Sequence, residues 1–138
     1  MKRRTRRILW FVLAICAGAI IVGTVFLAQY IPLLEAYRKT IEELVIEEVD
    51  LALVQDGTFA GSFGAGFVEA DVRVLVHDHR IVSIDLYRHQ HGRGEKAEAV
   101  VGHAIQAQSL EVDLITGATS SSKVILKAIE NALRKGIQ

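Results

Sequence analysis

The chain has one cysteine, one proline and one tryptophan among 138 residues, and its formal net charge is zero. A single cysteine excludes an intrachain disulfide, so a hydrophobic core has to stabilise the folded part. The sequence has no internal repeat and no low-complexity linker. Once an N-terminal apolar run is set aside, the remaining length allows one small domain.

The longest uncharged run extends from Ile8 to Ala28. It is long enough to span a bilayer, which takes about 20 apolar residues, whereas the apolar part of a signal peptide has about 7–15. Phe26-Leu27-Ala28 is a poor cleavage site, and the large Ile15 makes a lipid-modified Cys16 a minor alternative. We therefore predict a transmembrane anchor over residues 8–28.

Five cations precede this anchor within residues 1–7, and the first charge after it is Glu35. The positive-inside rule then predicts a cell-membrane protein with a cytoplasmic basic segment and an extracytoplasmic remainder. The rest of the chain has eleven basic and sixteen acidic residues, so its formal net charge is −5. Such a surface does not indicate nucleic-acid binding.

Residues 29–52 are predicted to form a juxtamembrane amphipathic helix that begins near Pro32. Its apolar side chains recur at helical spacing: Leu34, Tyr37, Ile41, Leu44 and Val45. Because this stripe covers barely two heptads, we favour a helix packed on its own domain over a coiled-coil stalk.

Residues 53–138 are predicted to form an α+β domain with an antiparallel sheet flanked by helices. Residues 58–67 indicate a glycine-rich strand whose backbone can approach a ring or another strand. Residues 72–76 alternate in polarity, residues 77–80 form a polar turn, and residues 81–86 resume as a strand. On that second strand we expect Val82, Ile84 and Leu86 to share one face, and residues 95–106 to be helical.

The segment Asp113–Ser122 reads DLITGATSSS and carries the strongest functional signal. Gly117 permits a positive φ, Ala118 adds almost no steric screen, and the Thr119 hydroxyl is presented just before a helix predicted from Ser122. Free N–H groups and the helix dipole favour an anion there by about 0.3–1 kcal/mol. Taken alone, the same residues also fit an ordinary helix cap.

The pattern D-x-x-[S/T]-G-A-T resembles the flavinylation motif of the FMN-binding domain family. This family includes domains of the C subunit of sodium-translocating NADH:quinone oxidoreductase and of the G subunit of the Rnf complex. Further similar segments are Asp56–Phe59, Val68–Leu86, His89–Gly94, Gln108–Asp113 and Ser121–Leu133. The His89–Gly94 segment lacks the E-T-P sequence of the large-complex subunits, which favours a stand-alone member.

The resemblance implies that Thr119 carries FMN through a phosphoester bond, installed from FAD by a separate flavin transferase. It further implies that Thr116, Gly117 and Ala118 shape the site, that Asp113 belongs to the transferase's recognition pattern, and that Ser120 and His89 lie near the cofactor. Thr119 has no evident base beside it in the sequence, so self-flavinylation is disfavoured.

The expected function is electron relay between unidentified redox partners, with the flavin doing the redox chemistry. No catalytic acid–base pair is recognisable, so the chain resembles an electron carrier more than a self-sufficient enzyme. The alternatives are a noncovalent FMN-binding or sensory module and a structural domain without a cofactor.

Two histidine pairs, His77/His79 and His89/His91, have the i, i+2 spacing of residues on one strand face. That spacing invites a metal hypothesis, but no compact third ligand is evident, so we expect no metal site. The first pair is expected to be a surface turn. The aromatic residues that either stack on a flavin or belong to the core are Phe59, Phe63, Phe67 and Tyr87.

Overall fold

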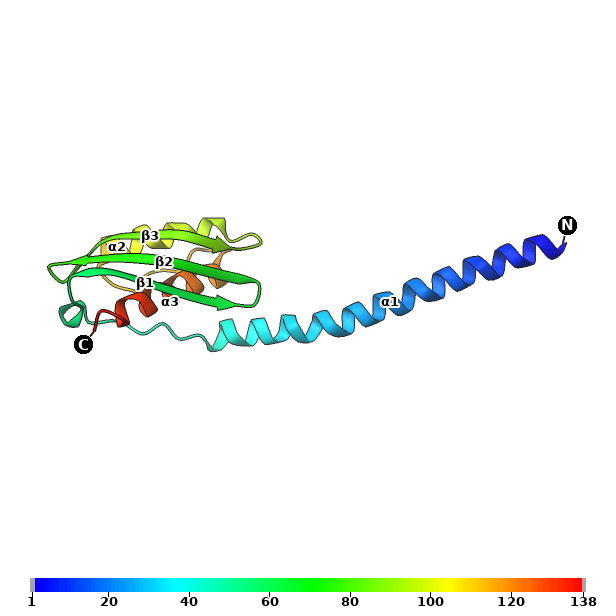
Figure 1. The fold of residues 1–138 in the computed structure, drawn as a ribbon, viewed down its shortest axis with the longest axis horizontal. Helices are drawn as coiled ribbons and strands as arrows, with labels where there is room; N and C mark the ends of the chain where they lie inside the picture. Colours follow the sequence, from blue (N-terminus) through cyan, green and yellow to red (C-terminus); the bar gives the residue numbers. More distant parts are fainter. Residues whose placement is uncertain (1, 138) are drawn as a thin grey trace. The chain divides into compact units, whose positions relative to one another are not determined.

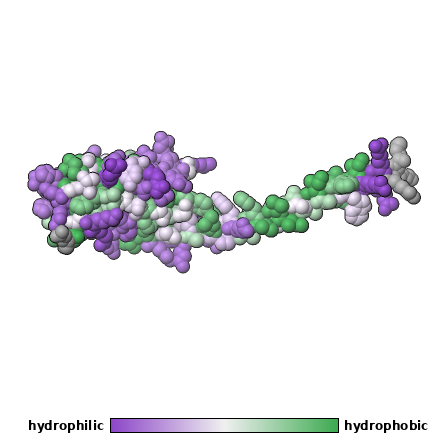
Figure 2. Space-filling model, viewed as in Figure 1, coloured by the Kyte–Doolittle hydropathy of each residue, from purple (hydrophilic) through white to green (hydrophobic). Residues whose placement is uncertain are grey.

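The computed structural model describes residues 2–137, which divide into two compact units, 2–38 and 39–137. The first unit is helical throughout, because α1 runs from Lys2 to Glu43 (Figure 1). It passes through Pro32 without a break, so this residue lies inside the helix and not at its start. By length and composition α1 can cross a membrane, and its exposed side chains are mostly apolar between Ile8 and Leu33 (Figure 2).

Helix α1 ends at Glu43, so the predicted helix over 29–52 is too long at its C-terminal end. Two lysines of a later helix bind the carbonyl groups at this point. Lys123 Nζ donates to Ile41 O at 2.9 Å, and Lys127 Nζ donates to Val45 O at 3.1 Å. Lysine side chains satisfy the unpaired carbonyls at a helix C-terminus, which stabilises the end of the helix here.

Three antiparallel strands form the sheet, in the order β1 (Gly57–Ala65), β2 (Val68–His77) and β3 (Arg80–Gln90). The polar turn predicted between β2 and β3 is present. Asp78 and His79 have φ values of 50° and 57°, as a two-residue type I′ hairpin requires.

Strand β3 is longer than predicted and irregular at Val82. Val76 pairs with Ile81, whereas Leu75 pairs with Ser83, so Val82 is the extra residue of a bulge and is 51% exposed. The prediction that Val82 shares a face with Ile84 and Leu86 is therefore wrong, because a bulge interrupts the two-residue alternation.

The helices of the second unit are α2 (Ala99–Ala107), α3 (Thr119–Arg134) and two short 3₁₀ turns, η1 (Leu51–Leu53) and η2 (Glu95–Glu98). Helix α3 packs on β1 and β2, and α2 packs beside β3 (Figure 1). The predicted apolar face of α3 is buried throughout: Ile125, Ala128, Ile129, Ala132 and Leu133. The predicted α+β class is confirmed.

Gly61 on β1 lies directly against α3. A Cβ atom at this position would lie 2.1 Å from Ala128 O and 2.5 Å from Ala132 N. Only glycine allows so close an approach. The glycine-rich strand therefore brings its backbone to a helix as well as to β2, where Gly61 pairs with Val72.

Glu130 of α3 is a charged residue in this core, and its side chain is 1% exposed. Its carboxylate accepts hydrogen bonds from Lys127 Nζ at 2.9 and 2.8 Å, from Arg134 Nε at 2.8 Å and from the Glu47 backbone N–H at 3.0 Å. Arg134 also pairs with the Glu47 carboxylate. This network attaches residues 44–50, which follow α1, to α3.

Burial by itself would raise the pKa of the Glu130 carboxyl. The hydrogen bonds from Lys127, the Glu47 amide and Arg134 outweigh that effect, and the pKa lies below its ordinary value of 4.5. A carboxyl whose pKa is lower in the folded than in the unfolded state stabilises the fold above the unfolded pKa. That contribution is lost as the pH falls through the folded pKa.

Glu130→Gln is expected to destabilise the second unit by about 2–3 kcal/mol, because Lys127 and Arg134 lose their counter-charge. Urea unfolding of the detergent-solubilised chain, followed by near-ultraviolet circular dichroism, measures this change. The variant is also expected to lose the part of the acid destabilisation that occurs below about pH 4.5 in the wild type.

Glu43→Gln is the matched control, because Glu43 forms an exposed i, i+4 pair with Lys39 at 3.8 Å. Its effect is expected to stay below about 0.5 kcal/mol. Equal unfolding free energies for Glu130→Gln and Glu43→Gln would contradict a stabilising role for the buried network.

Candidate functional site

The turn before α3 depends on Gly117. Its φ is +80°, as predicted, and the Ala118 N–H donates to Ile115 O at 2.9 Å to close the turn. A Cβ at Gly117 would meet no heavy atom within 4 Å, so the requirement for glycine comes from the backbone conformation and not from crowding.

Helix α3 begins at Thr119, three residues earlier than predicted, and Ala118 is its N-cap. Thr119 is therefore the first helical residue and not the residue before the helix. The reason lies in the backbone: the Ser122 N–H already donates to Ala118 O at 2.9 Å. The Thr119 side chain is exposed and Ala118 is buried.

No described side chain caps the first N–H groups of α3. These groups have no partner inside the helix, and with the helix dipole they favour a bound anion by about 0.3–1 kcal/mol. The alternative of an ordinary helix cap is not realised by Ser122, because this residue donates its hydroxyl to Ala118 O at 3.0 Å. The Ser122 oxygen also accepts from the Ile115 N–H at 3.1 Å, which fixes the turn. The geometry therefore fits a phosphate at the exposed hydroxyl of Thr119.

The other predicted residues of this segment are accessible. Asp113 and Thr116 are exposed, and Ser120 is half-buried. A shallow depression borders Asp113 and is lined by His103, Gln106, Ala107, Glu111 and Val112. The turn and its surroundings thus present polar groups to solvent.

The segment His89–Gly94 reaches the first turn of α3 through Gly94. A Cβ at Gly94 would lie 2.0 Å from Ser121 Oγ, so the Gly94 backbone packs directly against the Ser121 side chain. The same Cβ would lie 3.2 Å from His91 Cβ. Two segments that resemble the same family but lie far apart in sequence therefore meet at the start of α3.

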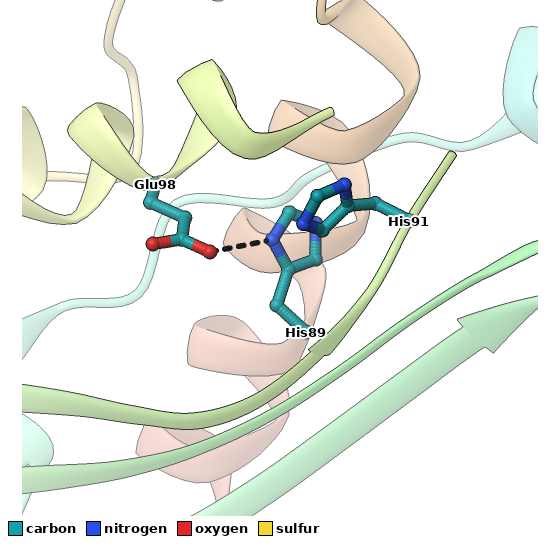
Figure 3. A group of neighbouring side chains, drawn as sticks. All are labelled: His89, His91 and Glu98. Atoms are coloured by element: carbon teal, nitrogen blue, oxygen red, sulfur yellow. Dashed lines mark hydrogen bonds and ion pairs between the residues drawn. The ribbon is translucent and has the colours of Figure 1, made fainter. Parts of the chain in front are cut away.

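His89 and His91 are neighbours, with ring centroids 4.4 Å apart (Figure 3). The His89 side chain is 3% exposed, and its Nδ1 lies 3.1 Å from Glu98 Oε1. Among the described residues, only His89 Nε2 and His91 Nδ1 are buried side-chain polar atoms without a partner. Leaving such atoms unpaired costs about 1–3 kcal/mol each, so these two nitrogens are candidates to bind a ligand.

Sequence reasoning missed Glu98. Its carboxylate and one nitrogen of each histidine lie within 4.8 Å of one another, although Glu98 is seven residues beyond His91. The sequence did contain one indication of Glu98, because a helix was predicted to follow His89–Gly94. That segment turns back and brings Glu98 to His89 at the end of β3. The other histidine pair, His77/His79, was expected to lie in a surface turn. His77 is indeed exposed, and its ring pairs with the Asp56 carboxylate at 2.7 Å.

Two of the candidate aromatic residues, Phe59 and Tyr87, make separate contacts. Phe59 packs against Gly136, whose added Cβ would lie 2.7 Å from the ring. Tyr87 is half-exposed beneath Arg73, whose guanidinium lies 4.8 Å from the ring centroid. Neither contact belongs to the Thr119 turn.

The model of a family described as FMN-binding domain matches residues 65–134, about half of the chain. The matched range runs from the end of β1 to the end of α3, so it includes the Gly117 turn, Thr119 and the His89–Glu98 cluster. No curated protein matches the chain.

Proposed function

Because this chain belongs to the FMN-binding domain family, with FMN as its cofactor, we propose that it carries the flavin covalently on Thr119 and relays electrons between redox partners. The observation that carries the proposal is the exposed Thr119 hydroxyl at the uncapped N-terminus of α3. A phosphoester at this oxygen puts the phosphate beside free backbone N–H groups. Bound FMN supplies the redox chemistry.

Each residue of the turn has a role in this proposal. Gly117 turns the chain so that the hydroxyl faces solvent, and Ser122 holds that turn against α3. Thr119 Oγ1 bonds to the flavin phosphorus of FAD as AMP leaves, and the hydroxyl proton passes to a base of a flavin transferase. Asp113, exposed beside the shallow depression, is the group that the transferase recognises.

The proposal includes a location. The apolar helix α1 anchors the chain in the cell membrane, and the basic N-terminus stays in the cytoplasm. The flavin-carrying unit then faces outward, where its redox partners have to be exposed on the same side of the membrane.

Protease added to the outside of spheroplasts is expected to degrade the unit that contains Thr119. Immunoblotting with an antibody against the C-terminal residues follows the reaction. Complete protection until the spheroplasts are lysed would contradict the proposed orientation.

Thr119→Val is expected to abolish covalent flavin, because valine has nearly the shape of threonine but no hydroxyl. Thr119→Ser is the matched control and should retain flavin. The chain is co-expressed with a flavin transferase, and peptide mass mapping reads the adduct. An adduct that persists in Thr119→Val, or that maps to Ser120, Ser121 or Ser122, would refute the assignment.

Variants of Gly117 separate the hydroxyl from the turn that presents it. Gly117→Val should lower flavin incorporation although Thr119 is intact, since a β-branched residue resists a positive φ. Gly117→Asn should incorporate more than valine does, because asparagine tolerates this conformation and the position has free space. Equal incorporation by the two variants would show that the turn is unimportant.

A further inference from the structure

The cluster of His89, His91 and Glu98 is incomplete as it stands. His89 Nε2 and His91 Nδ1 are buried without partners, and the side chain that carries the first of them is 97% buried. Figure 3 shows the two imidazoles side by side, with Glu98 on the other side of His89. The two nitrogens without partners belong to rings whose centroids lie 4.4 Å apart, so one bound group can serve as the partner of both.

The hydrogen bond to Glu98 sets the chemistry of His89. A carboxylate accepts hydrogen bonds, so the Nδ1 atom that lies 3.1 Å from Glu98 Oε1 carries the proton. In the neutral imidazole the buried Nε2 atom then carries no proton, and its lone pair is available to a ligand. This is the arrangement in which a carboxylate that does not itself bind the metal orients a metal-binding histidine.

We propose that His89 Nε2 and His91 Nδ1 bind a divalent transition metal ion of the zinc class, with Glu98 as the positioning residue for His89. Imidazole nitrogens suit such ions, and the coordination positions that remain are open to water or to an added ligand. The centroids of the two imidazole rings already lie 4.4 Å apart, and Glu98 already holds the Nδ1 side of His89.

Metal binding here would connect the end of β3 to η2. His89 belongs to β3, His91 follows it, and Glu98 closes η2. Because Gly94, between them, contacts Ser121, the ion would also stabilise the segment that packs on the first turn of α3. A ligand that binds only the folded state raises the unfolding temperature, so stability is a second readout.

The test uses the full chain in detergent, made without a flavin transferase, treated with a chelator and dialysed. Titration calorimetry with ZnCl₂ and the visible absorption of added CoCl₂ are expected to give one ion per chain, and zinc is expected to raise the unfolding temperature. His89→Gln and His91→Gln should each weaken binding by about tenfold or more, and Glu98→Ala by about 10–100-fold. Circular dichroism checks that each variant is folded.

His77→Ala is the matched control. His77 also lies in a group with two carboxylates, Asp56 and Asp78, but all three residues are exposed. Its removal should leave zinc affinity unchanged. The proposal is overturned by the absence of stoichiometric binding, by undiminished binding in the folded double variant His89→Gln/His91→Gln, or by loss of binding in His77→Ala. None of these outcomes depends on whether Thr119 carries flavin.

Discussion

The contact between Gly61 and α3 is the constraint on which the rest of the second unit depends. The strand backbone lies so close to Ala128 and Ala132 that no side chain fits between them. This approach lets one amphipathic helix cover β1 and β2 and bury its whole apolar face. The position of α3 in turn fixes Thr119, which is the first residue of the helix. The site therefore stands on a packed element and not on a free loop.

Helix α3 also organises the chain that follows the apolar helix. Lys123 donates to the carbonyl of Ile41 in the last turn of α1, Lys127 donates to the carbonyl of Val45 just beyond it, and Glu130 accepts a hydrogen bond from the Glu47 N–H. Glu48 Oε2 accepts from the Leu110 N–H at 2.9 Å, close to the loop that leads to Asp113. Residues 44–50 are thus part of the folded unit. A buried carboxylate with three kinds of donor stabilises this arrangement only above its own pKa.

Local pattern was sufficient to predict the features that local physics decides. The turn at Asp78 and His79, the positive φ of Gly117 and the apolar face of α3 are all visible in composition and spacing. Three other features could not be predicted from local sequence, because each depends on residues distant in the chain. They are the end of α1, the bulge at Val82 and the pairing of His89 with Glu98. The start of α3 was misjudged because serines favour caps, whereas Ser122 here bonds back to Ala118.

The central claim is that FMN is attached covalently, and the intact mass of the denatured chain tests it most directly. The chain is made with and without a co-expressed flavin transferase, and both samples are measured under denaturing conditions. With the transferase, we predict a mass increase of one FMN less one water, and without it no increase. An unchanged mass in both samples, with flavin released on denaturation, would contradict covalent attachment and leave a noncovalent flavin-binding module.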